Sequence, residues 1–288
     1  MQQETIRNRR PREVTLRVGR GTLSFAAYDG DSSQGADADS SAVVYEPFVV
    51  KSGISMAANL RDAFRTAPLL QQGYRYARVA VDAPTLLVPM DLFTPESAPE
   101  LYAYTFPQQA HHVVMDQPLE GLGAIALFGV NKDLKLVVDD HFEDPHFVCA
   151  LSGLWHRQHW HSYAGLRRRL YAYFHEGCLD VFSFQKNRFK FCNQFEAQHA
   201  ADALYYLLYI WKQLMLKPEH DELWLLGALA PAGRNALPTQ EAINETEQLV
   251  RELTRYVGHV NTIPTTDIAA MPAAMPYDLK VLMSESRP

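Results

Sequence analysis

The stretch VTLRVGRGTLSFAAY, residues 14–28, decides the fold class. Its first five residues alternate between apolar and polar side chains, and residues 22–28 are mostly apolar. The short turn Gly19-Arg20-Gly21 separates the two runs. Two such runs joined by a glycine turn are typical of a β-hairpin. We therefore expect the chain to open with two antiparallel strands.

A second hairpin is predicted in the stretch LYAYFHEGCLDVFSF, residues 170–184, because an offset of 156 positions aligns its turn with the first one. The aligned pairs are Gly21 with Gly177, Leu23 with Leu179, Phe25 with Val181 and Ala27 with Ser183. The spacing of apolar residues then predicts a third strand, a helix and a fourth strand after each hairpin. These lie at 43–50, 54–65 and 76–81 in the first half and at 188–195, 197–216 and 222–226 in the second.

A duplicated β-β-β-α-β unit predicts two α/β lobes, each a mixed β-sheet flanked by helices, with a cleft between them. Ligands commonly bind in such clefts. We expect lobe I at residues 14–162 and lobe II at residues 163–288, the latter with a docked Pro-rich C-terminal tail. Residues 1–13 are predicted to form a flexible basic arm, and the Gly/Ser/Asp-rich segment 30–42 a mobile loop.

Composition places the chain among ordinary globular proteins. Of its 288 residues, 47% are hydrophobic and 21% are charged, which excludes a wholly disordered chain. The longest strongly apolar run, residues 203–211, is far shorter than the roughly 20 residues that cross a bilayer. Three widely separated cysteines form no CxxC motif and argue against a disulfide framework. The N-terminal residues do not resemble a signal peptide, so we expect a cytoplasmic protein.

The formal charge of −6 is unevenly distributed. The first twelve residues carry Arg7, Arg9, Arg10 and Arg12 against Glu4, a net charge of +3 that leaves −9 for the rest of the chain. An acidic body excludes a generic nucleic-acid binder, whose domain would be basic. The arm could still contact phosphate or an acidic partner. A solvated, frayed terminus is the simpler interpretation.

The duplicated topology resembles the actin-like, or ribonuclease H-like, ATPase fold of actin, Hsp70 chaperones and sugar kinases. Several stretches between about residues 14 and 283 also resemble the DUF3822 family of Bacteroidetes proteins. They are residues 45–48, 55–60, 87–89, 92–93, 127–130, 179–182, 205–214, 221–223 and 276–279. The resemblance implies an actin-like fold and no established activity.

The first hairpin turn can be compared with the phosphate-binding turn of that fold, Asp-x-Gly-Thr. The glycines of such a turn let backbone N–H groups approach phosphates, and the acid organises Mg²⁺ and the attacking water. Gly19, Gly21 and Thr22 match this pattern, but Arg17 stands at the position of the acid. The resemblance therefore implies a phosphate turn that lacks its carboxylate.

The second hairpin turn departs further from the pattern. Tyr173 falls at the acid position, and Gly177 is the only glycine. The adenosine-contacting loop of the fold, a strand that ends in Gly-Gly, corresponds to residues 225–228 and keeps only Gly227. Mg–ATP needs carboxylates on the metal and glycines around the phosphates. We therefore expect a degenerate nucleotide cleft, with ATP and Mg²⁺ not retained as cofactors.

These observations favour a non-catalytic scaffold or interaction protein with a protein partner. The alternative is an ATPase or phosphotransferase with a rewired cleft, in which Glu176 or Asp180 coordinates the metal. A third hypothesis is a nucleic-acid-associated factor that uses the arginine arm at residues 7–12.

Three further clusters have simple structural interpretations. His156 and His159 would share a helical face and could bind Zn²⁺, but a packed aromatic connector between the lobes also explains them. The acidic segment 139–146 matches no known metal loop and predicts a solvated helix exit. The run Arg167-Arg168-Arg169 precedes a strand and predicts a solvated sheet edge.

Overall fold

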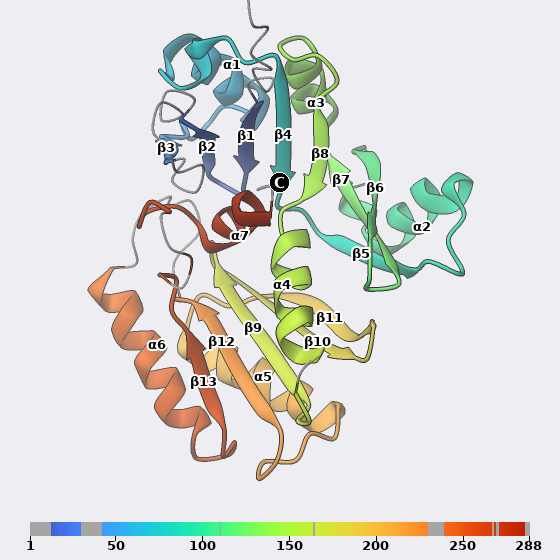
Figure 1. Ribbon diagram of the computed structural model, residues 1–288, viewed down its shortest axis with the longest axis vertical. Coiled ribbons are helices and arrows are strands. Elements are labelled where there is room, and N and C mark those ends of the chain that lie inside the picture. The colour runs from blue at the N-terminus through green and yellow to red at the C-terminus, as the bar shows by residue number, and fades with distance from the viewer. Residues whose placement is uncertain are drawn as a thin grey trace, which may run out of the picture.

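The computed structural model describes residues 13–29, 42–109, 111–163, 165–229, 239–266, 268 and 271–285. The expected basic arm, apart from Glu13, and the expected mobile loop, apart from Ala42, lie outside these residues. The described chain forms two lobes, one above the other in Figure 1. Each lobe contains a five-stranded sheet, and a smaller sheet projects from the first lobe.

The sheet of the first lobe has the strand order β3-β2-β1-β4-β8. Its strands are β1 (Glu13–Val18), β2 (Leu23–Tyr28), β3 (Val43–Phe48), β4 (Tyr76–Val81) and β8 (His146–Cys149). Antiparallel pairing joins β3, β2 and β1, and parallel pairing joins β1, β4 and β8. Five of the six residues of β1 are buried, because hydrophobic clusters cover both faces of the sheet.

The second lobe repeats this arrangement with the strand order β11-β10-β9-β12-β13. Its strands are β9 (Arg169–His175), β10 (Cys178–Gln185), β11 (Arg188–Glu196), β12 (Glu222–Gly227) and β13 (Val260–Ile263). Antiparallel pairing joins β11, β10 and β9, and parallel pairing joins β9, β12 and β13. The hairpins, third strands and fourth strands predicted from the sequence thus hold corresponding places in the two sheets. The expected duplicated α/β fold is confirmed.

The third sheet, with the order β5-β7-β6, lies beside the first one, and α2 packs against it (Figure 1). Its strands are β5 (Thr85–Pro89), β6 (Val113–Leu119) and β7 (Ala124–Val130). The helices are α1 (Met56–Thr66), α2 (Ala98–Thr105), α3 (Lys132–Asp139), α4 (Ser152–Tyr163), α5 (Ala200–Gln213), α6 (Gln240–Leu253) and α7 (Tyr277–Glu285). Short 3₁₀ turns lie at Leu70–Gln72, Pro95–Ser97 and Pro107–Gln109. In the described part of the chain, no helix has the length and apolar character needed to span a membrane.

Side-chain caps set the starts of three helices. Ser55 accepts a hydrogen bond from the N–H of Ala58 at the start of α1. Asn131 caps α3, and Thr239 caps α6 in the same way. Each cap satisfies a backbone donor that has no partner within the first turn of a helix. The cap of α1 starts this helix within two residues of position 54, where the sequence pattern predicted its beginning.

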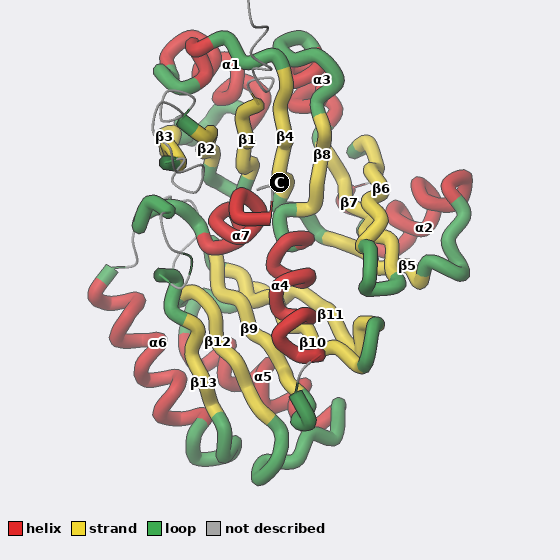
Figure 2. Tube along the Cα trace, in the orientation of Figure 1, coloured by secondary structure: helices red, strands yellow, loops and turns green. Residues whose placement is uncertain are grey.

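Helices cover the sheets in layers (Figure 2). In the first lobe, α1 and α3 share a hydrophobic cluster with β1, as Leu60, Val137 and Leu16 illustrate. In the second lobe, α5 and α6 cover one face. On the other face, Trp155 of α4 packs edge-on against Phe189 of β11, with ring centroids 5.5 Å apart. One cluster contains buried residues of both lobes, so the lobes share a continuous hydrophobic contact.

Two helices, α4 and α7, contact each other between the lobes. A Cβ on Gly153 of α4 would lie 3.3 Å from the backbone N of Leu282 in α7, so the close approach favours glycine. The sequence predicted a docked C-terminal tail but not this helix. Leu279 packs with Ala26 and Val43 of the first sheet, although the tail was assigned to lobe II. The boundary between residues 162 and 163 stays a prediction.

Candidate functional site

The two turns that the sequence matched to phosphate-binding turns face each other between the lobes. Gly19, Gly21 and Thr22 belong to the β1–β2 turn, and Glu176 and Gly177 form the β9–β10 turn. Gly19, Thr22 and Gly177 are buried, and Gly21 is partly buried. The carboxylate of Glu176 reaches the opposite turn. Four of the five predicted site residues therefore lie at one place in the fold.

Gly227 lies at the end of β12, where it pairs with Phe174 of β9 and has a φ of 76°. A Cβ on this residue would overlap the carbonyl oxygen of Phe174. Local strand packing and the left-handed backbone therefore explain the glycine. A nucleotide contact by Gly227, or by the four residues of the turns, stays a prediction.

Glu176 occupies the β1–β2 turn as a bound anion would. Its Oε2 accepts a hydrogen bond from the N–H of Gly21 at 3.3 Å, and its Oε1 accepts one from the hydroxyl of Thr22 at 2.7 Å. A Cβ on Gly19 would overlap Glu176 Oε1, so glycine leaves room for the carboxylate. Glu176 and Gly177 have φ values of 46° and 77°, which is the conformation of a tight two-residue hairpin turn. This turn holds the carboxylate inside the other lobe's turn.

Arg17 of β1 lies next to that carboxylate and is 1% exposed. Its Nη1 is 2.5 Å from Glu176 Oε1, and its Nη2 is 2.7 Å from Asp278 Oδ2. Its Nε also donates to both carboxylate oxygens of Asp278 at 3.0 Å. Arg17 in the first lobe is thus bound to the second lobe through Glu176 and to α7 through Asp278. We call Arg17, Glu176 and Asp278 the Arg17 triad.

A second buried ionic group surrounds His175 of β9. Its Nε2 makes a very short contact with Asp180 Oδ2 in β10, and its Nδ1 lies 3.4 Å from Asp82 Oδ2. Gln194 of β11 donates to the same oxygen of Asp180 at 3.1 Å. Asp82 follows β4 of the first lobe, so this group also connects the lobes. We call His175, Asp180 and Asp82 the His175 triad.

Opposite charges outweigh the cost of burying these groups. Burial lowers the pKa of Arg17, but Asp278 and Glu176 raise it to well above its usual value. Burial likewise lowers the pKa of His175, but Asp82 and Asp180 raise it to well above 6.5. Burial raises the pKa of Asp82, whereas His175 and Arg17 lower it to about 2. Each cation is therefore charged at neutral pH and lies between two carboxylate side chains.

The residues at this place do not fit Mg–ATP. The N–H and hydroxyl groups that would meet a phosphate oxygen are bound to Glu176. Arg17 stands at one acid position, and Tyr173, which stands at the other, accepts the backbone N–H of Asp278 at 3.3 Å. Burial and the charge of Asp278 raise the pKa of Tyr173 well above 10, so it stays a neutral phenol. A phosphate group would have to displace Glu176 and lie close to Asp278.

Asp82 and Asp278 were not predicted from the sequence as members of the site. Asp278 is 261 residues from Arg17, and no local pattern links the two. The strand pattern did not reveal the burial of Arg17 either, because polar positions of an alternating strand usually face solvent. Asp82 could have been suspected because it directly follows a buried parallel strand.

Two histidines of α4, His156 and His159, make hydrogen bonds to backbone carbonyl groups. His156 contacts the carbonyl oxygens of Ser152 and Glu120 at 2.9 and 3.0 Å. His159 contacts that of Lys186 at 2.9 Å. Within the described residues, no group of three or more His, Cys, Asp or Glu side chains is placed to hold a metal ion. These contacts match the interpretation of α4 as a packed connector.

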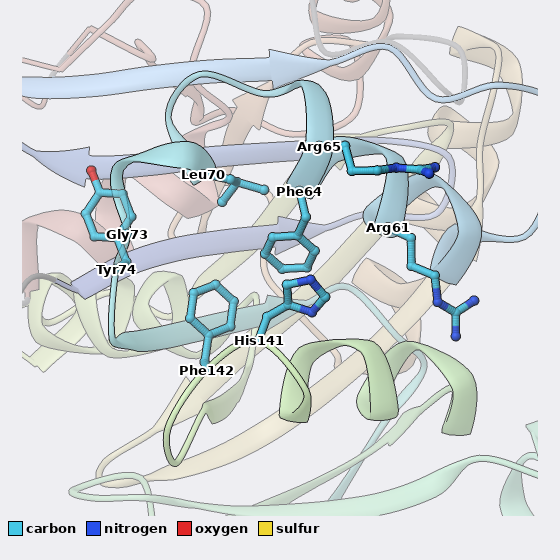
Figure 3. Close-up of a pocket in the computed structure, with 8 residues that line it drawn as sticks. All are labelled: Arg61, Phe64, Arg65, Leu70, Gly73, Tyr74, His141 and Phe142. Carbon is cyan, nitrogen blue, oxygen red and sulfur yellow. The ribbon is translucent and has the colours of Figure 1, made fainter.

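A surface pocket of about 480 Å³ lies on the first lobe, between α1 and the segment that follows α3 (Figure 3). Phe64 of α1 stacks on His141, with ring centroids 3.7 Å apart. The side chains of Arg61 and Arg65 extend away from these rings. The pocket shares no lining residue with the two triads, so it is separate from the contact between the lobes. In the acidic segment beside it, Glu143 is paired with Arg75 at 2.6 Å.

The His175 triad predicts a loss of stability at alkaline pH. The pKa of His175 is raised well above its unfolded value of 6.5, so its stabilising contribution is complete below about pH 6.5. That contribution is lost as the pH rises through the folded-state pKa. Asp82 behaves in the opposite sense, because its pKa falls from 3.8 to about 2 on folding. Its contribution is lost as the pH falls through this range.

Urea unfolding between pH 6 and pH 10 measures the alkaline effect. We expect His175→Gln to flatten the fall in unfolding free energy with pH, because glutamine does not titrate. His199→Gln is the matched control, since His199 is 73% exposed and lies 4.0 Å from Glu245. An unchanged slope in His175→Gln would show that His175 is not charged in the folded protein.

The matching sheets of the two lobes and the facing hairpin turns define a protein of the actin-like ATPase fold. A structure from Bacteroides thetaiotaomicron VPI-5482, described as a protein with an actin-like ATPase fold and unknown function, is 21% identical with a TM-score of 0.75, covering 96% of each chain. The sequence model of the DUF3822 family, described as "Protein of unknown function", matches residues 2–253, and the chain belongs to this family.

A second similar structure is the PilM–PilN type IV pilus biogenesis complex. It is 13% identical, has a TM-score of 0.54, and covers 97% of this chain and 100% of that chain. At these identities the likeness shows the fold alone. The search of curated proteins gave no match. The family and the fold inferred from the quoted motifs are both confirmed.

Proposed function

We propose that this chain is a non-catalytic interaction protein in which its own ion pairs replace a nucleotide as the link between the lobes. The position of the Glu176 carboxylate supports this proposal most strongly. It is bound by Gly21, Thr22 and Arg17 inside the β1–β2 turn of the first lobe. An anion supplied by the chain itself is present in every molecule. The contact between the lobes then does not depend on binding or hydrolysis of a ligand.

A fixed relation between two lobes suits a scaffold, because a partner meets the same surface at all times. Both triads cross between the lobes, and a shared hydrophobic cluster supports them. The PilM–PilN structure is itself a protein complex, which supports a protein partner by analogy of fold. The cytoplasm is the compartment that we propose, from the cysteine usage.

The contacts of Glu176 and Asp180 argue against the alternative of an ATPase or phosphotransferase, although the fold is shared with ATPases. That hypothesis needs Glu176 or Asp180 as a metal ligand. Glu176 is bound to Arg17 and Thr22, and Asp180 is bound to His175 and Gln194. If the alternative were correct, the protein would release phosphate from Mg–ATP, and Glu176→Gln would abolish the release.

A thermal-shift titration with Mg–ATP tests the proposal. We expect no saturable change in Tm up to 1 mM Mg–ATP. A ligand present at 100 times its Kd stabilises a fold by about 2.7 kcal/mol. For a chain of this size that corresponds to a rise in Tm of about 4–5 °C. A saturable rise of this size would overturn the proposal, and Mg–ADP serves as the second ligand in the same assay.

A further inference from the structure

Positively charged residues are concentrated in one segment near the middle of the chain. Residues 145–195 contain seven Lys and Arg residues but only two acids, Glu176 and Asp180, in a chain where acids outnumber bases by 33 to 27. Both acids are buried in the triads, so they do not offset the positive charge at the surface. The seven cations are Arg157, Arg167, Arg168, Arg169, Lys186, Arg188 and Lys190.

Three of these cations are already paired. Arg168 lies 2.6 Å from Asp221, and Arg167 and Arg169 lie 3.4 and 2.9 Å from Glu222. The run of residues 167–169, at the start of β9, is therefore held by ion pairs. The sequence had predicted a simple solvated sheet edge here. Lys186, Arg188 and Lys190 differ, because all three are exposed. None of them has an ion-pair partner among the described residues.

A pocket of about 540 Å³ lies where the end of α4 meets the β10–β11 hairpin. Its lining residues are Tyr163, Gln185, Lys186, Asn187 and Arg188. They supply one aromatic ring, two amides and two cations, and no acid or aliphatic side chain. A hydrogen bond from His159 to the carbonyl oxygen of Lys186, 2.9 Å long, holds α4 to the hairpin. His159 also packs edge-on against Phe184.

Two large aromatic residues of α4 are exposed at this place. Trp160 is 78% exposed and Tyr163 is 69% exposed. They are three residues apart and therefore neighbours on the helix surface. Lys186 is the first residue of the two-residue turn between β10 and β11, and this turn accounts for its φ of 56°. The turn places Lys186 and Asn187 at the tip of the hairpin, beside Tyr163 in the lining of the pocket.

We propose that this surface, formed by Trp160, Tyr163 and residues 185–188, binds single-stranded nucleic acid. Exposed aromatic rings stack with unpaired bases, and cations beside them follow the phosphate backbone. The amides of Gln185 and Asn187 can hydrogen-bond to base edges. A duplex keeps its bases stacked on one another, so it cannot use the rings. A lipid surface would leave the amides of the pocket without partners, which makes it the less suitable occupant.

The surface shares no residue with the two triads or with the arginine arm. The inference therefore does not depend on the proposed loss of ATPase function. An acidic net charge does not exclude such a surface, because an acidic chain can carry a basic aromatic surface when its acids lie elsewhere.

Fluorescence anisotropy with fluorescein-labelled 20-mers of oligo(U) and oligo(dT) tests the proposal, from 50 to 300 mM NaCl. We expect saturable binding at the lowest salt concentration. The double variant Lys186→Gln/Arg188→Gln should bind at least about tenfold more weakly. Its dependence of log Kd on log salt should be less steep by about 1.4, which corresponds to two lost phosphate contacts on a single strand. Tyr163→Ala should weaken binding about tenfold through lost stacking and leave the salt dependence unchanged.

The matched controls make substitutions of the same type at exposed residues of the first lobe. Arg61→Gln/Arg65→Gln removes two surface cations, and Tyr104→Ala removes a tyrosine that is 90% exposed. Both controls should bind like the wild type, as should a chain without residues 1–12. Circular dichroism confirms that each variant is folded.

Three outcomes would overturn the proposal. The first is the absence of saturable binding at 50 mM NaCl. The second is binding that survives the changes at Tyr163, Lys186 and Arg188, or that disappears only with residues 1–12. The third is binding to vesicles of phosphatidylglycerol and phosphatidylcholine in place of either oligonucleotide.

Discussion

Replacing Arg17 by methionine is expected to lower the free energy of unfolding by about 3–5 kcal/mol, because two buried carboxylates lose their shared cation. Arg17 is 1% exposed, and the side chains of Glu176 and Asp278 are 6% and 1% exposed. Water cannot replace the guanidinium at such sites. The variant must bury unpaired carboxylates, protonate them or open the contact between the lobes. Urea unfolding followed by circular dichroism measures the loss.

A second variant of Arg17 also neutralises the two carboxylates that it pairs with. We expect Arg17→Met combined with Glu176→Gln and Asp278→Asn to recover much of the lost stability, because no uncompensated charge is then buried. Arg75→Met is the control for loss of an arginine, since Arg75 and its partner Glu143 are both more than 60% exposed. That control should change stability little. A loss in Arg17→Met no larger than in the control would contradict the buried triad.

Removal of α7 is expected to have an even larger effect. Residues 277–283 of this helix are all buried. Leu279 and Met283 pack with Ala26, and Leu282 packs with Ala80, so the helix covers one face of the first sheet. Asp278 of the same helix completes the Arg17 triad. Truncation of one buried Leu or Met to Ala costs about 2–5 kcal/mol. Loss of the whole helix therefore exceeds the total stability of about 5–15 kcal/mol of a typical protein.

A chain that ends at Pro276 tests this expectation against a control that ends at Glu285. We expect the shorter chain to lose cooperative unfolding, and its β1 and β4 amides to lose protection from hydrogen exchange. The control should keep the wild-type unfolding midpoint. A truncated protein with the wild-type midpoint and protected β1 amides would show that α7 is not part of the first lobe's structure.

Much of the fold could be predicted because it rests on local patterns. Alternating apolar and polar residues beside glycine turns predicted both hairpins. The constant offset of 156 positions between the hairpins predicted the duplicated lobes. The C-terminal helix could not be predicted in this way. Its nine residues follow several prolines, and both apolar and charged members are buried. Such a segment becomes helical because of what it packs against, which a local pattern does not contain.

The site was predicted only in part for a related physical reason. The glycines of the first turn and the unsuitable residues at both acid positions were visible in the sequence. The partners of Arg17 were not, since Glu176 and Asp278 lie 159 and 261 residues away. Glu176 was first considered as a metal ligand. In the fold its carboxylate takes the place of an anion in the opposite turn, which only the arrangement of the two lobes can reveal.

The central claim is that charge pairing between the two turns holds the lobes together. A double-mutant cycle between Arg17 and Glu176 tests it most directly. The cycle compares the unfolding free energies of the wild type, Arg17→Met, Glu176→Gln and the double variant. We predict a coupling free energy of about 2–3 kcal/mol, at the upper end of the range for residues in contact. A coupling close to zero would contradict the claim that the Arg17–Glu176 pair joins the lobes.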